Sequence, residues 1–178
     1  MIRAAEPAGL RLEGLSAAQV AEVLGMSPHR EGGYYRETYR SAIATPTPAG
    51  MRSLCTAILY MLTADDPSRF HRLRFDEMWF FHAGSPVEMV FLGPTETAVL
   101  GPRAPQALAP GGRWMAARIV EGAGQGEAAV AGAGPAWALV GCVVNPGFEY
   151  EDFEQPGRDV LLEAYPEAGE YIRALARR

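Results

Sequence analysis

Short apolar runs separated by clusters of Gly and Pro recur along most of the chain, and this pattern constrains the fold more than any other feature. Each run has the length of one β-strand, and several alternate apolar with polar residues as half-buried strands do. The runs that we interpret as strands or extended segments are 34–40, 53–63, 70–84, 87–92, 97–100, 114–120, 137–144 and 148–153. For 53–63 a helix is the rival interpretation, because periodicity alone does not separate the two. Short strands with such turns are typical of antiparallel sandwiches and barrels, so the sequence predicts a mainly β fold.

Three segments rich in Gly, Pro and Ala are interpreted as turns or loops: 44–50, 101–112 and 121–136. The last segment resembles a linker, but strands of the same type lie on both sides of it, so we interpret it as a hairpin loop. A length of 178 residues is typical of one domain. The chain is therefore divided into a flexible N-terminal arm at 1–15 and a single domain at 16–178.

Helices are predicted only near the two ends of the domain. Ser16 and Gln19 have the spacing of a capping box, which predicts a short helix after Ser16. Asp159 has the position of an N-cap for a second helix, and Pro166 fits the first turn of a third. We expect these short helices to pack against the sheets.

The composition excludes several classes of partner and of chemistry. The formal charge is −5, which argues against nucleic acid as a partner, and all 16 basic residues are Arg. Because the sequence contains no Lys, chemistry that needs a Schiff-base lysine or a P-loop lysine is excluded. No apolar run approaches the roughly 20 residues of a membrane span, and the N-terminus lacks a signal-peptide pattern. We therefore expect a cytoplasmic protein with no membrane partner, in which Cys55 and Cys142 are free thiols.

The segment Phe70–Gly84 concentrates groups that can do chemistry. If it were one continuous strand, His71, Glu77, Trp79 and Phe81 would share a sheet face, since alternate residues point the same way. A histidine and a carboxyl group beside aromatic rings predict a pocket on that face.

Residues on other strands complete the predicted pocket. Tyr35, Thr56 and Tyr60 are the candidate polar liners from neighbouring strands. Trp114 offers a flat face on which a sugar or a base would stack, and Arg118 offers a planar fork for a substrate anion. Each of these side chains also has a simpler interpretation as part of the core or of the solvated surface.

Four segments of the chain resemble a known family. They are EGGYYRETYRS (31–41), SRFHRLRFDEMWFFHAG (68–84), APGGRWMAAR (109–118) and VGCVVNPGFEYEDFE (140–154). In combination they resemble the cupin superfamily, and within it the Cupin-5 family, a domain of unknown function. The resemblance implies a double-stranded β-helix, or jelly-roll barrel, with a pocket inside the barrel and a homodimeric assembly.

The general cupin motifs are only partly present. His71, Glu77 and Gly84 fall in register with the first motif, but Leu73 occupies the place of its second His. Met115 occupies the place of the His in the second motif. Thioether and aliphatic side chains are poor ligands for hard or borderline divalent ions. We therefore expect no cofactor, although a loosely bound divalent metal held by His71 and Glu77 is compatible with the pattern.

A His–carboxyl pair in a sheltered pocket is suited to general acid and base catalysis. The metal-free sugar-nucleotide epimerases that share the cupin barrel use this chemistry. The favoured hypothesis is an isomerase or epimerase that acts on a sugar or sugar nucleotide, with His71 and Glu77 as the proton-transfer groups. The alternatives are a non-catalytic protein that binds a nucleotide, sugar or organic acid, and a metal-dependent cupin enzyme. In the simplest interpretation His71 and Glu77 only fix the barrel mouth.

The homodimer has modest support from the residues themselves. One strand edge carries Arg36, Thr38 and Arg40, and another carries the acidic residues Glu149 and Glu151. We expect a two-fold interface to involve one of these edges.

Overall fold

The computed structural model describes residues 12, 14–120 and 137–177. Most of the predicted arm at 1–15 and all of the predicted hairpin loop at 121–136 lie outside the described residues.

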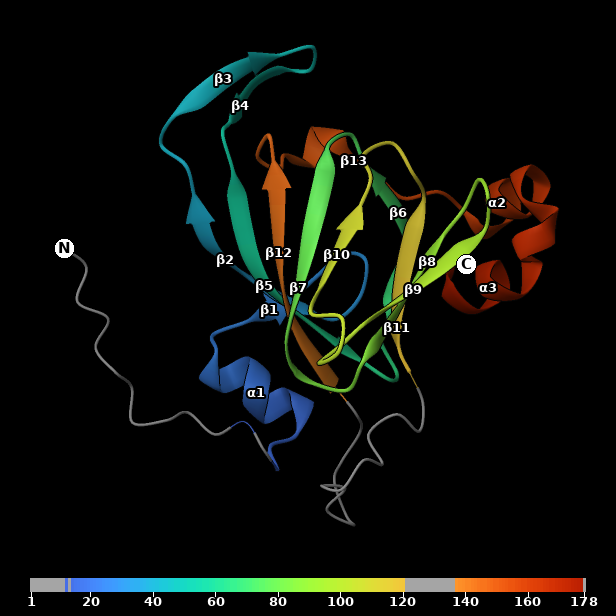
Figure 1. Ribbon diagram of the computed structural model, residues 1–178, viewed down its shortest axis with the longest axis horizontal. Helices are drawn as coiled ribbons and strands as arrows, with labels where there is room; N and C mark the ends of the chain where they lie inside the picture. The colour runs from blue at the N-terminus through green and yellow to red at the C-terminus, as the bar shows by residue number, and fades with distance from the viewer. Residues whose placement is uncertain (1–11, 13, 121–136, 178) are drawn as a thin grey trace.

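Strands dominate the described chain, which confirms the mainly β prediction (Figure 1). The strands are β1 (Ser27–Pro28), β2 (Tyr34–Arg40), β3 (Ala44–Thr47), β4 (Gly50–Ser53), β5 (Thr56–Thr63), β6 (Ser68–Leu73), β7 (Asp76–Gly84), β8 (Val87–Phe91), β9 (Glu96–Leu100), β10 (Gln106–Ala109), β11 (Met115–Ile119), β12 (Trp137–Asn145) and β13 (Phe153–Glu154). The helices are α1 (Ala17–Val23), α2 (Arg158–Ala164) and α3 (Gly169–Leu175), with 3-10 turns η1 (Tyr150–Asp152) and η2 (Pro166–Ala168).

Two antiparallel sheets form the barrel. The first has the strand order β1-β2-β5-β12-β7-β10 and the second has the order β13-β6-β11-β8-β9. Tyr60 and Trp79 from the first sheet pack with Met89 and Met115 from the second in one buried core. The interior of the jelly roll is therefore filled by inward side chains from both sheets, as the 2-residue periodicity of the strands requires.

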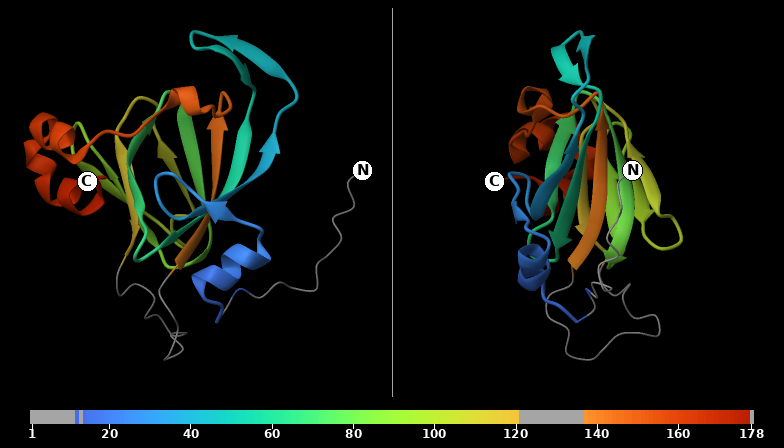
Figure 2. Two further views of the ribbon diagram at one scale, coloured as in Figure 1. Left: turned by 180° about the vertical axis from the view of Figure 1, so that it is seen from behind. Right: turned by 90° about the vertical axis from the view of Figure 1, so that its left-hand side faces the viewer.

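Helices cover the outer face of each sheet (Figures 1 and 2). Val20 of α1 packs against Met61 and Leu139, which point away from the barrel interior on the first sheet. Leu161 and Ile172 of α2 and α3 bury the outer face of the second sheet. The central strands β5 and β12 are apolar on both faces because one face meets the barrel interior and the other meets α1. The predicted capping box is confirmed, since Ser16 Oγ accepts the N–H of Gln19 and the Gln19 side chain accepts the N–H of Ser16.

The structure differs from the sequence interpretation in five places. The segment 70–84 is not one strand, because it divides into β6 in the second sheet and β7 in the first. The N-cap of α2 is Gly157, and Asp159 lies in the first turn of the helix instead. The predicted turn at 44–50 lies in a two-stranded hairpin, β3–β4, that projects from one end of the barrel in Figure 1. Pro46 is tolerated there because β3 pairs only with β4 and is an edge strand. The predicted loop at 101–112 contains β10, which pairs with β7. The predicted extended segment 148–153 folds instead into η1 before the short β13.

Within the part of the chain that the structure describes, no helix is long and apolar enough to cross a membrane. Cys55 and Cys142 are free, as expected. The homodimer stays a proposal, and the two edges that suggested it meet within one chain, because Arg40 pairs with Glu149 at 2.7 Å.

Candidate functional site

A cavity of about 160 Å³ lies in one end of the barrel. Its walls come from β2, β5, β6, β7 and β12, and the segment 148–153 contributes Phe148, Tyr150 and Phe153. Its lining includes two histidines, His29 and His71, and two buried carboxyl groups, Glu31 and Glu77. The barrel thus brings acid–base groups from three separate parts of the sequence to one enclosed space.

His71 enters the cavity from β6 and is only 2% exposed. Its Nδ1 lies 2.8 Å from the carbonyl oxygen of Arg69 and 3.1 Å from Oε2 of Glu31. A carbonyl oxygen can only accept, so Nδ1 carries the proton and the neutral ring keeps its lone pair on Nε2. Burial lowers the pKa of His71, against the opposing effects of the Glu77 charge and the Arg69 carbonyl. His71 is therefore a neutral ring with one nitrogen able to accept a proton.

Glu77 lies near the beginning of β7 and is 7% exposed. The indole N–H of Trp79 donates to Oε2 of Glu77 over 2.7 Å, which holds the carboxyl group and leaves its other oxygen outside this bond. Burial raises the pKa of Glu77 to about 7, although His71 opposes the shift. At neutral pH this carboxyl group is therefore present in both its protonated and its ionised form.

Glu31 is a buried acid that the sequence analysis did not single out. It is 6% exposed, and its Oε1 lies 3.7 Å from Nδ1 of His29 while its Oε2 contacts His71. Burial raises the pKa of Glu31, and the neighbouring His29 opposes this. Burial also lowers the pKa of His29, whose Nδ1 accepts the backbone N–H of Glu31 at 3.4 Å. One carboxyl group thus lies between two imidazole rings.

The position of Glu31 depends on a turn rather than on a strand. Gly32 and Gly33 have φ of 118° and 69°, and a Cβ on Gly32 would lie 2.1 Å from the carbonyl oxygen of Pro67. Only glycine fits this close approach of two backbones. The double glycine after His29-Arg30-Glu31 is a sequence signal that could have indicated this tight turn, but periodicity assigns no direction to side chains in a turn.

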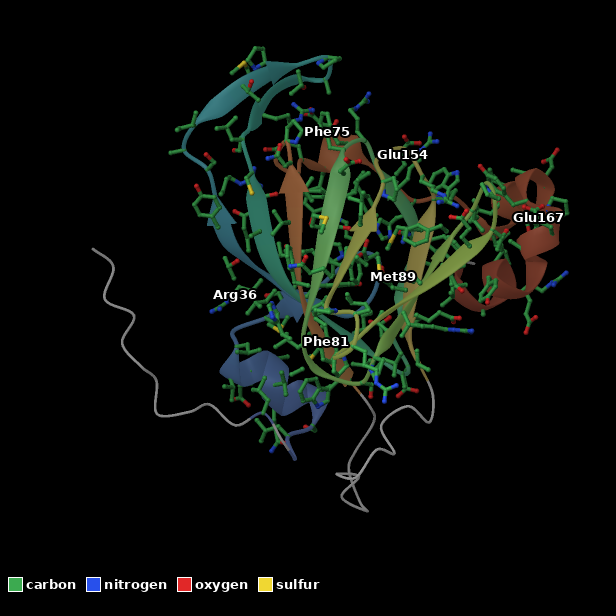
Figure 3. The ribbon with its side chains drawn as sticks, viewed as in Figure 1. Arg36, Phe75, Phe81, Met89, Glu154 and Glu167 are labelled. Atoms are coloured by element: carbon green, nitrogen blue, oxygen red, sulfur yellow. The ribbon has the colours of Figure 1, made fainter. Side chains whose placement is uncertain are left out.

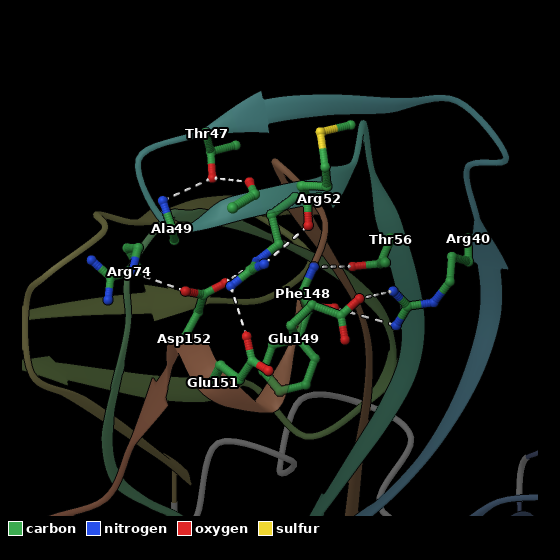
Figure 4. Close-up of polar contacts among 12 residues, drawn as sticks. Arg40, Thr47, Ala49, Arg52, Thr56, Arg74, Phe148, Glu149, Glu151 and Asp152 are labelled. Atoms are coloured by element: carbon green, nitrogen blue, oxygen red, sulfur yellow. Dashed lines mark hydrogen bonds and ion pairs between the residues drawn. The ribbon is translucent and has the colours of Figure 1, made fainter.

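Ion pairs hold the rim of the cavity together (Figure 4). Arg40 donates to Glu149 at 2.7 Å and to Glu37 at 2.9 Å, which joins β2 to the segment that covers the opening. The backbone N–H of Phe148 donates to Thr56 Oγ1 at 2.9 Å. We call the segment 148–153, which covers the opening, the cover. The hydroxyl of Thr56 therefore holds the cover in place, in addition to lining the cavity.

Asp152 anchors the same cover from the other side. It accepts hydrogen bonds from Arg52 at 2.6 Å and from Arg74 at 2.9 Å (Figure 4). Burial alone would raise the pKa of Asp152, but the two arginines outweigh it and the pKa is lowered. The turn η1 is thus fixed to β4 and to the residues that follow β6.

The residues predicted to line the pocket lie at two different depths in the barrel. Tyr35 and Thr56 line the cavity, but Tyr60, Trp79 and Phe81 do not. These three pack in the core further along the barrel, and the hydroxyl of Tyr60 donates to the carbonyl of Gly32 at 2.8 Å. In Figure 3, Phe81 lies toward the end of the barrel opposite Phe75, which precedes β7. The prediction for these three is corrected because alternation assigns the face of a residue but not its depth.

Trp114 and Arg118 lie outside the cavity, which corrects their prediction as well. They share the outward parity of β11 with Ala116, whereas Met115 and Ala117 point into the core. Trp114 packs beneath the guanidinium of Arg72 at 4.4 Å, and Arg118 donates to Glu88 at 2.7 Å. Neither residue is placed to contact a ligand beside His71.

Comparison with known proteins identifies the family. The model of the cupin superfamily family DUF985 matches residues 18–155. The chain belongs to this cupin family. A search of curated proteins returned no significant match.

Solved structures share this cupin architecture. A hypothetical protein from Leishmania major is 31% identical, with 92% of this chain and 100% of that chain covered and a TM-score of 0.80. A protein from Shewanella oneidensis is 33% identical, with 92% and 98% covered and a TM-score of 0.77. A cupin 2 domain-containing protein from Halorhodospira halophila is 12% identical, with 85% and 88% covered and a TM-score of 0.52, and shows the fold alone.

The cavity of this cupin does not fit the usual cupin metal site. His71 and Glu77 supply two donors, while Leu73 lines the cavity with an aliphatic side chain and Met115 pairs with His71 across β6 and β11. Among the described residues, no group of three or more His, Cys, Asp or Glu side chains is arranged to hold a metal ion.

Proposed function

We propose that this cupin is an isomerase or epimerase that moves a proton at a carbon next to a carbonyl group of a sugar or sugar nucleotide. The observation that carries the proposal is that a buried imidazole, His71, and a buried carboxyl group, Glu77, line one cavity together. The pKa of His71 is lowered and that of Glu77 is raised to about 7, so at neutral pH His71 is uncharged and Glu77 is partly protonated. Such pairs divide the roles of base and acid between two groups.

In the proposed reaction the lone pair on Nε2 of His71 takes the proton from the carbon. The electrons of the broken C–H bond form a carbon–carbon double bond, and the carbonyl oxygen takes the proton of Glu77. This produces a neutral enediol and the His71 imidazolium–Glu77 carboxylate pair. If the His71 imidazolium then protonates the former carbonyl carbon while the Glu77 carboxylate takes the hydroxyl proton of the other carbon, the isomer forms. If the enediol instead turns over in the cavity, the imidazolium protonates the opposite face of the first carbon and the carboxylate takes back its proton, which gives the epimer. Both routes restore both groups.

The cavity volume limits which part of a substrate lies inside. About 160 Å³ is below the roughly 300–1,000 Å³ of pockets that enclose drug-sized ligands. The cavity therefore suits one sugar unit. The nucleotide part of a sugar nucleotide would lie outside the rim formed by Arg40 and Glu149.

The test is deuterium exchange in D2O with a panel of aldoses, ketoses and sugar nucleotides, followed by NMR or mass spectrometry. We expect incorporation at the carbon next to the carbonyl, and its loss in His71→Gln and Glu77→Gln. His82→Gln and Glu154→Gln are matched controls, because both residues are exposed. Circular dichroism checks folding of each variant. Equal exchange in the wild type and in both site variants would overturn the proposal.

Binding of a sugar without any exchange would instead favour the non-catalytic alternative. Thermal-shift measurements separate the two, since a ligand at about 100 times its Kd stabilises the folded state by about 2.7 kcal/mol.

A further inference from the structure

A second hollow, of about 590 Å³, lies beside the cavity and is rich in arginine. Arg30, Arg69 and Arg177 line it together with Phe153 and Gln155. We call it the arginine hollow. Three guanidinium groups at one place are notable in a chain whose formal charge is −5.

The fold assembles the arginine hollow from distant parts of the sequence. Arg30 lies in the turn between β1 and β2, and Arg69 lies on β6. Arg177 follows α3, where it is held by a backbone bridge to Gly157. Phe153 is brought to β6 by its pairing with Leu73. No local sequence motif predicts this convergence.

The positive charge of the arginine hollow is only partly neutralised. Arg69 pairs with Asp66 at 2.9 Å and also donates to the carbonyl of Glu31 at 3.0 Å. Among the described residues, Arg30 and Arg177 form no ion pair with a carboxylate. The guanidinium of Arg30 lies 4.3 Å from the ring centre of Tyr150 instead. Two guanidinium groups therefore keep donors for an anion.

Gln155 adds an uncharged donor with no partner. Its Nε2 is buried, and no acceptor for it is found among the described residues. A buried donor without an acceptor destabilises the folded state, and an oxyanion in the hollow would remove this cost. Arginine also suits such a ligand, since its planar fork matches the geometry of phosphate and carboxylate.

Two aromatic residues connect the arginine hollow with the cavity. Phe153 lines both, and its ring stacks on that of His71 with centroids 5.5 Å apart. Tyr150 lines the cavity on one side and lies beneath Arg30 on the other. The ring of Phe153 thus lies between the arginine hollow and His71, the proposed base.

We propose that the arginine hollow binds an anionic group, a phosphate or a carboxylate, of the same ligand whose carbonyl carbon enters the cavity. The inference rests on the proposed function and narrows its substrate class to small carbonyl compounds that carry an oxyanion a few bonds from the reacting carbon. A dianionic phosphate gains most from three guanidinium groups.

Calorimetric titration at constant ionic strength tests the anion site directly. Inorganic phosphate and acetate are the probes, and they distinguish the two oxyanion types. Glucose 6-phosphate and ribose 5-phosphate are then compared with glucose and ribose. We expect tighter binding of each phosphorylated sugar than of the parent sugar. The variant Arg30→Ala with Arg177→Ala should weaken binding at least tenfold, as loss of about 1.4 kcal/mol would.

Controls separate failure of this inference from failure of the proposed function. Arg103→Ala removes an exposed arginine away from the hollow and should leave binding unchanged. Glu77→Gln should lose deuterium exchange but keep its affinity for phosphate. Phosphate affinity that is equal in the wild type and in the double arginine variant would overturn the anion site. A phosphorylated sugar that binds no tighter than inorganic phosphate would overturn the shared ligand.

Discussion

Oε2 of Glu31 lies 3.1 Å from Nδ1 of His71, and both groups are buried in the barrel. This contact places a carboxyl group behind the proposed base, on the ring nitrogen that does not face the reaction. When Nε2 of His71 accepts a proton, an ionised Glu31 would stabilise the imidazolium that forms. Glu31 is thus a positioning residue that acts through His71.

Glu31→Gln tests this role, because glutamine keeps the shape and removes the charge. We expect deuterium exchange to fall by roughly tenfold, about 1.4 kcal/mol in transition-state stabilisation. Loss of the nearby negative charge should also lower the pKa of His71 and move the acidic limb of the pH–rate profile to lower pH. Glu154→Gln is the control on the protein surface. An unchanged profile in Glu31→Gln would show that its role is only structural.

The raised pKa of Glu77 predicts a pH-dependent cost to folding. Between its ordinary value of 4.5 and about 7, Glu77 is protonated in the folded state but ionised in the unfolded state. The unfolded state then binds fewer protons, so this group lowers the free energy of unfolding as pH rises. Glu77→Gln removes the effect. It should gain stability relative to the wild type from pH 5 to pH 8, by at most roughly 3 kcal/mol.

Urea denaturation of both proteins at several pH values measures this difference. His29 and Glu31 titrate in both proteins. The pKa of His71 depends on the Glu77 charge, so the difference reports Glu77 together with its coupling to His71. Parallel stability curves would contradict the prediction.

Arg40 is predicted to retain ligand rather than to stabilise the fold. Its pairs with Glu37 and Glu149 are partly exposed, and such pairs contribute about 0–1 kcal/mol to stability. Arg40→Ala should therefore unfold at nearly the wild-type urea concentration but release ligand faster, because the cover is no longer tied to β2. Stopped-flow release measures the rate. Arg36→Ala, on the same strand, is the control and should release ligand at the wild-type rate.

The two substituted motif positions predict how a metal site could be introduced. Leu73 lines the cavity and Met115 pairs with His71, so Leu73→His with Met115→His would add two imidazoles near His71 and Glu77. We expect the double variant to bind Co²⁺ in a 1:1 ratio and at least tenfold more tightly than the wild type. The visible absorption of bound Co²⁺ reports the site. Equal affinity in both proteins would mean that the four positions do not converge.

Sequence reasoning was most successful where a residue lies on a regular strand. Alternation predicts that His71 and Glu77 share one sheet face. The structure instead places them on β6 and β7 of opposite sheets, and both line one cavity because each strand turns that side chain toward the barrel interior. The same rule treats Trp79 as equivalent to Glu77, although Trp79 lies two residues further along the barrel where the core is filled. Depth depends on how many large side chains the opposite sheet contributes, and a strand pattern contains no such information.

The parts that were missed depend on contacts between distant turns. Glu31 reaches His71 because Gly32 and Gly33 allow the turn to approach the chain at Pro67. The cover of the cavity folds as a 3-10 turn rather than as a strand, since Asp152 pairs with Arg52 and Arg74. Such ion pairs join positions that are separated by about half the chain, so local propensity does not predict them.

The barrel is filled with side chains at one end and hollow at the other, so substitutions in the two halves differ in their effect on stability. Tyr60, Trp79 and Met89 belong to the filled half, where a smaller side chain would leave a void. The hollow half is lined by strand residues such as His71 and Glu77 and by residues of turns and of the segment 148–153. Substitutions at the rim, where side chains already border open space, should therefore reduce the thermal resistance of the protein less than substitutions in the filled half.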